Sequence, residues 1–224
     1  MSNLIIPKEY KSSLDLIKTQ KAIKLIKDFF QINLSEKLNL IRVSAPLFVD
    51  KQSGFNDNLS GTEVPVSFKV SQDGEDVDLE IIHSLAKWKR NALASYNIEV
   101  GQGLYTDMNA IRSCEICDNT HSYYVDQWDW EKAISPNERN EEYLKKVVRD
   151  IYDVLLDTEN MLSETYDDYN KILPKEITFI TTFELEEMYP DISFEEREKL
   201  FAKEKGAIFI SKIGRNLKCG KPHS

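Results

Sequence analysis

The sequence predicts an α+β protein in which an antiparallel sheet is flanked by helices. Two observations support this prediction. Apolar residues alternate with polar ones in neighbouring stretches that a turn signal joins, as in an antiparallel hairpin. Stretches with helical periodicity are gathered around these strands, without the regular alternation of strand and helix that a doubly wound sheet requires.

The first predicted element is a helix over residues 16–40. Apolar residues recur there at three- and four-residue intervals with lysines between them, as in an amphipathic helix. They are Ile17, Ala22, Ile23, Leu25, Ile26, Phe29, Phe30 and Leu34. The next residues, 41–49, are rich in β-forming side chains but contain Pro46. A proline cannot donate to a sheet ladder, so we expect an edge or interface strand there.

The middle of the chain predicts a hairpin followed by a helix and two more strands. Residues 64–70 and 77–81 alternate apolar and polar side chains, and the turn formers of Ser71–Glu75 lie between them. A short helix is predicted over residues 86–96. Two further strands are predicted near residues 103–112 and 121–130.

The last third predicts two helices and two strands. A long helix is expected after Pro136 to about Tyr166, and residues 176–181 are a strand candidate. A capping-box pattern at Ser193 begins another helix, which Gly206 would end before a strand over residues 207–213. Because no repeat or low-complexity linker interrupts the sequence, we expect residues 1–224 to form a single domain.

Composition narrows the class of protein. The 224 residues are 41% hydrophobic and 30% charged, which is typical of a globular protein. The net charge of -9 argues against nucleic-acid binding, which needs a basic field. No apolar run approaches the roughly 18 residues that a membrane span needs, and the N-terminus lacks the pattern of a secretion signal. With three cysteines, an odd number, these features predict a cytoplasmic protein.

The first candidate functional cluster is the loop Gly54–Gly61, with Asp57 at its middle. Asn, Asp and Gly dominate turns for backbone reasons alone. On composition, the loop is therefore either a simple turn between two strands or a loop that presents Asp57 to a substrate.

The second cluster is His83–Arg90, the densest basic segment of an acidic chain. Lys87, Lys89 and Arg90 are too close in sequence to share one helix face, so only some of them can converge on one ligand. The segment is either a solvated helix face or a site for carboxylate or phosphate groups.

The third cluster, Gly101–Arg112, contains a Gly-x-Gly and ends in an arginine. The glycines would let the backbone approach a nucleotide, and Arg112 could make paired hydrogen bonds to a phosphate. A single Gly-x-Gly is a weak signal and is more often an ordinary loop.

The fourth cluster is Tyr123–Trp130. In a strand, alternation places Asp126, Trp128 and Trp130 on one face, and Gln127 and Asp129 on the other. Gln127 and Asp129 would then form a polar patch able to bind an amino group or a metal. The alternative is that the tryptophans fill the core while the acids face water.

Taken in order, these clusters resemble the aspartate–ammonia ligase (asparagine synthetase A) family, which is related to the class II aminoacyl-tRNA synthetases. The segments Thr19–Ile23 and Arg42–Leu47 match that family as well. The similarity is most specific in His83–Arg90 and Val125–Glu131, two long strings that contain tryptophan. The resemblance covers nearly the whole chain.

The resemblance implies the class II synthetase fold and a homodimer. The segment around Pro46 would correspond to the dimer-forming first motif. The stretch that ends at Arg112 would correspond to the second motif, whose arginine contacts the nucleotide α-phosphate. The implied reaction joins L-aspartate and ATP, with Mg2+, into β-aspartyl-AMP and pyrophosphate. Ammonia then attacks the activated carbonyl, which yields L-asparagine and AMP.

The resemblance also implies the binding residues. Lys89 and Arg112 would neutralise carboxylate and phosphate oxygens, while Gln127 and Asp129 would hold the amino acid. A carboxylate is a poor electrophile until AMP makes a leaving group of its oxygen, so positioning and charge neutralisation supply most of the help.

Two more residues receive roles from the resemblance. Asp57 would orient the ammonium ion or accept its proton as it attacks, and Ser84 would donate a hydrogen bond to the substrate. The resemblance therefore implies catalytic roles for Asp57 and Arg112 and a substrate-binding role for Ser84.

Members of the family are longer than this chain. In them an acidic Asp-Tyr-Asp-Asp-Trp segment and a glycine-rich third motif with an ATP-binding arginine follow the matched region. We therefore expect some strands, the metal-binding acids and part of the adenylate site to lie outside these 224 residues. The chain would be either a fragment of a longer product or a naturally truncated paralogue.

Cys114 and Cys117 depart from the family pattern. With His121, Cys219 and His223 they could be drawn as a tetrahedral zinc site. A single Cys-x-x-Cys in an expected loop supports zinc only weakly. We expect an exposed insertion that carries free thiols, and no metal ligand.

Two other functions compete with the enzyme. One is a non-catalytic module that binds an amino acid or adenylate, which substrate-dependent release of AMP would separate from a ligase. The other is an aspartyl-tRNA synthetase. The chain has no room for an anticodon-binding domain, and its negative charge gives no support for tRNA binding.

Overall fold

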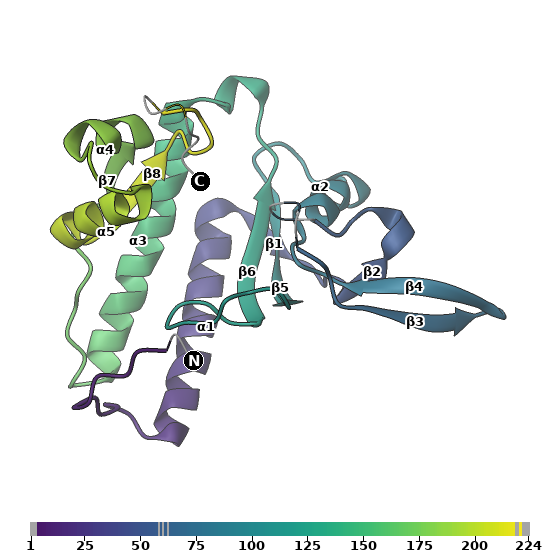
Figure 1. Ribbon diagram of the computed structural model, residues 1–224, viewed down its shortest axis with the longest axis horizontal. Coiled ribbons are helices and arrows are strands. Elements are labelled where there is room, and N and C mark those ends of the chain that lie inside the picture. The colour runs from purple at the N-terminus through teal and green to yellow at the C-terminus, as the bar shows by residue number, and fades with distance from the viewer. Residues whose placement is uncertain (1–3, 58, 60, 62, 218–219, 221–224) are drawn as a thin grey trace. The chain divides into compact units, whose positions relative to one another are not determined.

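A computed structural model describes residues 4–57, 59, 61, 63–217 and 220 (Figure 1). The chain divides into two compact units, Met1–Asn140 and Glu141–Ser224. The elements mix helices with mainly antiparallel strands, so the α+β prediction is confirmed. The prediction that residues 1–224 act as one domain stays a prediction.

The first unit contains two α-helices, two short 3-10 helices and two three-stranded sheets among its described residues. In chain order they are α1 (Leu16–Leu38), β1 (Leu40–Arg42), β2 (Phe48–Asp50), η1 (Lys51–Ser53), β3 (Ser67–Gln72), β4 (Glu75–Ile81), α2 (Ala86–Ser95), β5 (Gly103–Ile111), β6 (Tyr124–Lys132) and η2 (Pro136–Glu138).

Helix α1 confirms the first predicted element and has defined caps. Asp15 accepts a hydrogen bond from the backbone N–H of Lys18 at 2.8 Å, which satisfies one free donor of the first turn. Asn39 ends the helix in the left-handed conformation, with φ 57°. On the side facing the sheet, Phe30 stacks on Trp128 of β6 with ring centroids 4.6 Å apart.

The first sheet has the order β1-β5-β6, with β1 parallel and β6 antiparallel to the central strand β5. Gly103 lies at the start of β5, where the three strands β1, β5 and β6 lie side by side. A Cβ atom there would lie 2.5 Å from the carbonyl oxygen of Glu131 and 2.6 Å from Cδ2 of Leu40. Only glycine therefore allows β1 and β6 to approach β5 this closely.

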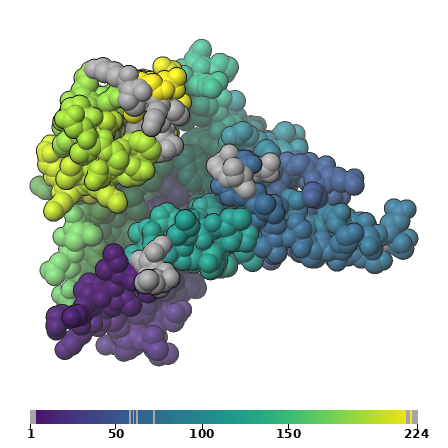
Figure 2. All heavy atoms as spheres, in the orientation of Figure 1, coloured from purple at the N-terminus to yellow at the C-terminus, as the bar shows by residue number. Residues whose placement is uncertain are grey.

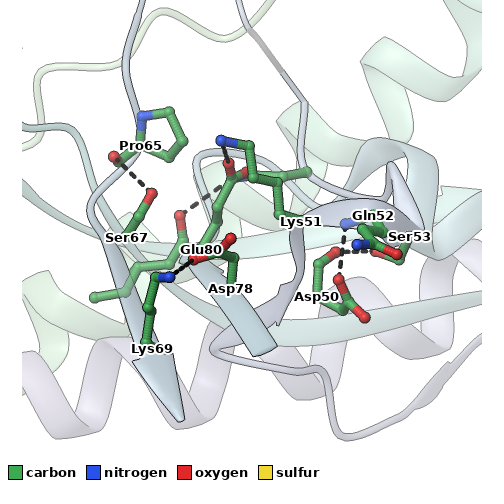
Figure 3. Close-up of polar contacts among 11 residues, drawn as sticks. Asp50, Lys51, Gln52, Ser53, Pro65, Ser67, Lys69, Asp78 and Glu80 are labelled. Carbon is green, nitrogen blue, oxygen red and sulfur yellow. Dashed lines mark hydrogen bonds and ion pairs between the residues drawn. The ribbon is translucent and has the colours of Figure 1, made fainter. Parts of the chain in front are cut away.

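The second sheet has the order β2-β4-β3 and contains the predicted hairpin. Asp73 and Gly74 form its turn with φ 52° and 87°, which are the backbone angles that a type I′ turn requires. The hairpin projects from the rest of this unit (Figure 2). Nζ of Lys51 in η1 lies 3.9 Å from Oε1 of Glu80 in β4, and Figure 3 shows this ion pair with the neighbouring polar contacts.

The edge position expected for residues 41–49 is confirmed, but the single strand is wrong. The segment divides into β1 and β2, which belong to different sheets. Pro46 lies in the connection between them, where its missing N–H removes no ladder hydrogen bond.

Helix α2 contacts both β5 and β6 and lies over the opposite sheet face from α1. Between α2 and the sheets is an apolar core that draws on both sheets. Its buried members are Val49, Ile82, Leu85, Met108 and Ala110. This core fixes the start of α2 against the strand ends that carry the candidate site residues.

The second unit is built on a long helix and a two-stranded sheet. Its elements are α3 (Glu141–Thr165), β7 (Thr178–Thr181), α4 (Thr182–Met188), α5 (Phe194–Lys205) and β8 (Ile208–Ser211). The predicted capping box at Ser193 and the end at Gly206 are both confirmed. Helix α4 was not predicted, although Thr181 and Glu184 form a capping box at its start.

Strands β7 and β8 pair in parallel because α4 and α5 connect them. The parallel pair departs from the antiparallel arrangement that the sequence predicts for the strands. Within the described stretches of the chain, no helix combines the length and the apolar character that a membrane span requires.

Candidate active site

A buried lysine in α2 is the centre of the candidate site. The Lys89 side chain is only 3% exposed. Its Nζ donates to Oδ1 of Asp129 at 2.5 Å and to the backbone carbonyl of Trp130 at 3.0 Å. Glu131 adds a second carboxylate at 3.7 Å. An ammonium group has three N–H donors, and the two hydrogen bonds use two of them.

The alternation predicted for β6 is confirmed. Asp126 pairs with Lys27 of α1 and Trp128 stacks on the same helix, while Asp129 pairs with α2 on the other face. Gln127 is exposed and shares the face of Asp129, opposite Met108 in the register of the sheet. The two residues expected to hold an amino acid therefore do lie on one face.

The loop that carries Asp57 is tied to this region by its neighbour Asn56. The buried Asn56 amide donates to Oε2 of Glu80 and to the carbonyl of Ile81, both at 3.3 Å. Its Oδ1 accepts from the backbone N–H of His83 at 2.9 Å. Asp57 itself is half-buried. The loop is thus more than a turn between strands, because it is fixed to the start of the His83–Arg90 segment.

The basic residues of α2 separate as predicted. Lys89 points into the protein, whereas Lys87 and Arg90 are exposed. Nζ of Lys87 donates to the carbonyl oxygen of Asn56 at 3.3 Å, which adds another link to the Asp57 loop. Arg90 lies 3.5 Å from Glu131. Of these three residues, Lys89 alone is buried.

Ser84 has a local structural role. Its Oγ accepts from the backbone N–H of Ala86 at 3.2 Å at the start of α2. This bond uses the hydroxyl oxygen as an acceptor and not the hydroxyl proton.

Arg112 follows directly after β5 and extends the sheet by one further bond. Its backbone N–H donates to the carbonyl of Tyr123 at 2.8 Å. The alternation of β5 places Arg112 on the same face as Met108 and Ala110, toward α2. Its Nε is buried and has no hydrogen-bond partner among the described residues.

A small cavity of about 70 Å³ lies beside Arg112. It is lined by Leu59, Glu63, His83, Arg112, Ser113, Cys114 and Glu115. His83 is fully buried, at 1% exposure. Burial lowers the pKa of His83 below 6.5, and the Arg112 cation adds to this effect, while Glu63 and Glu80 oppose it. The imidazole is therefore neutral at physiological pH.

His83 and Asn56 are the residues that the sequence did not single out individually. His83 belongs to the candidate cluster His83–Arg90, but no pattern in that segment predicts that its ring is buried beside Arg112. For Asn56 the sequence predicts only the role of a turn residue. A contact 27 positions away in the chain carries no local signal.

The described residues contain no group of three or more His, Cys, Asp or Glu side chains that could hold a metal ion. Cys114 is exposed and Cys117 half-buried, both as free thiols. Nδ1 of His121 lies 2.9 Å from Asp118. Cys219 and His223, the other two ligands of the zinc arrangement considered above, lie outside the described residues.

A family model described as aspartate-ammonia ligase matches residues 17–224. The aspartate--ammonia ligase of Clostridium tetani is 56% identical over 220 residues, which cover 98% of this chain and 64% of the relative. That of Fusobacterium nucleatum is 59% identical over 214 residues, or 96% of this chain and 64% of the relative. This chain therefore spans just under two thirds of the length of these relatives.

Solved structures of class II aminoacyl-tRNA synthetases have a similar fold. Asparaginyl-tRNA synthetase from Pyrococcus horikoshii, complexed with asparaginyl-adenylate, matches with a TM-score of 0.58 at 14% identity. The match covers 86% of this chain and 45% of that one. The Entamoeba histolytica asparaginyl-tRNA synthetase matches with a TM-score of 0.52 at 15% identity, and covers 86% and 44%. The predicted class II synthetase-like fold is confirmed.

Proposed function

This chain belongs to the aspartate–ammonia ligase family, and on that premise we propose that it makes L-asparagine from L-aspartate, ammonia and ATP. The β-carboxylate of aspartate would attack the α-phosphorus of ATP and release pyrophosphate. Ammonia would then attack the carbonyl of the resulting β-aspartyl-AMP, and AMP would leave. The observation that supports this proposal most directly is the buried Lys89–Asp129 pair, on the sheet face that also carries Arg112.

Lys89 and Asp129 suit the two charges of an amino acid. Lys89 uses two of its three N–H donors on Asp129 and Trp130, so the third can bind a substrate carboxylate. Asp129 uses Oδ1 on Lys89 and keeps Oδ2 for the substrate ammonium group. Gln127, exposed on the same face, would add an amide contact, and the Ser84 hydroxyl would donate a further hydrogen bond.

Arg112 would act on the phosphate. Its buried Nε–H has no partner among the described residues, and a guanidinium is well suited to neutralise phosphate oxygens as charge develops on them. Asp57 would receive the attacking ammonia, either by orienting the ammonium ion or by taking its proton. The Asn56 contacts support this role, because they hold the Asp57 loop beside His83 and Ser84.

The resemblance to this family also implies Mg2+, which would neutralise charge on the phosphates of ATP. The described residues contain no group of three or more His, Cys, Asp or Glu side chains that could hold a metal ion by themselves. The residues named above are assigned to aspartate, ammonia and the phosphate, and none of them is assigned to this ion.

We further propose a cytoplasmic homodimer that binds neither nucleic acid nor a membrane. Leu47 and Phe48, next to Pro46, are 51% and 45% exposed, and Phe68 lies against Phe48 with ring centroids 5.3 Å apart. An apolar surface of this kind is suited to a protein partner. Sedimentation velocity of the wild-type chain and of a Phe48→Glu variant tests this. A monomeric wild type would contradict it.

The activity is tested by incubating the 224-residue chain with L-aspartate, ammonium, ATP and Mg2+. Asparagine and AMP are followed together, and ADP is measured as a check on unrelated ATPases. The Clostridium tetani relative, assayed in parallel, serves as the positive control. We expect asparagine and AMP in equal amounts. A chain that binds AMP but releases no asparagine would instead be a non-catalytic binding module.

A further inference from the structure

Two side chains that line the cavity beside Arg112 each carry a buried nitrogen atom that lacks a hydrogen-bond partner among the described residues. The two atoms are Nε of Arg112 and Nε2 of His83. Both side chains line the same cavity of about 70 Å³, which has room for only a few water-sized groups. A buried polar atom without a partner costs about 1 to 3 kcal/mol, so two of them on side chains that line one small cavity suggest that a ligand completes them.

The chemistry of the ligand follows from the donor at Arg112. The Nε–H of an arginine can only donate, so it requires an acceptor oxygen. A cation in this place would leave that donor without a partner. The neutral ring of His83 can donate to the same oxygen, or to its neighbour, when the proton is on Nε2.

We propose that Nε2 of His83 donates a hydrogen bond to an anionic oxygen of the substrate beside Arg112, which makes His83 a further catalytic residue. The oxygen belongs either to the phosphoryl group of the adenylate or to a carboxylate of aspartate. This inference rests on the proposed function for the identity of the substrate. The contact itself can be measured without turnover.

The charged groups around His83 favour recognition of the substrate oxygen by hydrogen bonds rather than by net charge. Glu63 and Glu115 line the cavity together with Arg112, and Glu80 acts on His83 from β4. With carboxylates at its wall, the cavity does not attract anions by net charge, so recognition depends on the hydrogen bonds of Arg112 and His83. The pKa of His83 is lowered chiefly by burial, which keeps the ring uncharged.

The position of His83 is fixed before a ligand binds. Its backbone N–H donates to Oδ1 of Asn56 at 2.9 Å, and its neighbours Ile82 and Leu85 are 1% and 0% exposed. A side chain held in this way loses little conformational freedom when it contacts a substrate.

Two substitutions separate a contact through Nε2 from a structural role. In His83→Gln the side-chain amide can reach the place of Nε2, whereas in His83→Asn it reaches only the place of Nδ1. We expect His83→Asn to lower kcat/KM for ATP or for aspartate about 10- to 100-fold, and His83→Gln to stay within about threefold of wild type. KM for ammonium should not change in either variant.

His121→Asn is the matched control, because His121 is exposed and contacts Asp118. It should behave as wild type. Equal activities of His83→Asn, His83→Gln and wild type would overturn the proposal. The proposal would also be overturned if both His83 variants lost the same share of kcat/KM and that share matched the fraction of unfolded protein measured by circular dichroism.

A second measurement needs no variant activity and identifies the ligand. The wild-type chain has three histidines, so 15N-histidine labelling gives a simple spectrum in which His83→Gln assigns the His83 signal. We expect the Nε2 resonance of His83 to move when AMP is added, if the oxygen is phosphoryl, or when L-aspartate is added, if it is carboxyl. No movement with either, or with both at saturation, would overturn the proposal.

The two proposals can fail separately. If the wild-type chain makes no asparagine but AMP or aspartate moves the His83 resonance, the contact stands and the ligase activity does not. If asparagine and AMP form while the resonance is unmoved and His83→Asn is fully active, only the role of His83 is wrong.

Discussion

Nζ of Lys89 in α2 and Oδ1 of Asp129 in β6 lie 2.5 Å apart, although 40 positions separate the residues in the chain. The lysine side chain is 3% exposed and the aspartate side chain 24%. The pair is therefore formed by packing of the helix on the sheet, before any substrate is present. A charge pair fixed in this way can bind a zwitterion without reorganising first.

Lys89→Met should destabilise the fold as well as weaken substrate binding. The change leaves Asp129 without its cation, and we expect a loss of about 3 kcal/mol in the free energy of unfolding, toward the lower end for a broken buried pair because Asp129 keeps some exposure. Urea unfolding followed by tryptophan fluorescence measures it. Lys24→Met is the control, because Lys24 pairs with Asp28 on an exposed helix face and should cost about 0.5 kcal/mol at most. Equal losses in both variants would contradict the buried role of Lys89.

Asp57→Asn should separate the two halves of the reaction. If Asp57 acts on ammonia, asparagine formation should fall about 100-fold while aspartate-dependent exchange of pyrophosphate into ATP continues. Radiolabelled pyrophosphate measures the exchange. Asp78→Asn, on the exposed hairpin beside Lys69, should leave both activities intact. Unchanged asparagine formation in Asp57→Asn would show that its proposed role is wrong.

Asn56→Ala should affect both stability and asparagine formation. It removes the partner of the His83 N–H and two contacts to β4, so we expect a loss of about 2 to 4 kcal/mol in the free energy of unfolding. Loss of these hydrogen bonds should also leave the Asp57 loop less firmly positioned, so kcat of the fraction that remains folded should fall. Asn33→Ala removes one hydrogen bond to Phe29 within α1 and should cost about 1 kcal/mol without a change in kcat. A normal kcat for folded Asn56→Ala would contradict the positioning role.

The buried imidazole predicts a loss of stability in weak acid. Burial lowers the pKa of His83 in the folded chain below 6.5, so between these two values the unfolded chain binds more protons than the folded chain. The free energy of unfolding should therefore fall as the pH falls below about 6.5. Urea unfolding at about pH 7.5 and about pH 5.5 should show a smaller difference for His83→Gln than for wild type. Identical differences would contradict the pKa shift.

Local signals were enough to predict most of the elements. The three- and four-residue spacing of apolar residues in α1 and the Asp-Gly turn of the β3–β4 hairpin depend on neighbours in the chain, and both predictions are confirmed. The prediction over residues 41–49 was wrong because the choice between one strand and two depends on which strands lie alongside. That information is not contained in the segment itself.

The candidate site required contacts that no local pattern contains. Alternation in β6 placed Gln127 and Asp129 on one face correctly, because a strand fixes that geometry. The pairing of Asp129 with Lys89 depends on how α2 packs across the sheet. The burial of His83 depends likewise on Asn56 and Arg112, which come from two other segments.

Alternation in β6 has a consequence for how this protein can change over evolutionary time. Even-numbered positions such as Asp126 and Trp128 meet α1, and odd-numbered positions such as Asp129 meet α2. A substitution on the first side should therefore act through folding, whereas one on the second side would also change substrate binding if the proposed function is correct. Sequence changes at the two sets of positions in β6 should therefore be accompanied by changes in different helices. Compensating changes for an altered Trp128 belong in α1, and those for an altered Asp129 in α2.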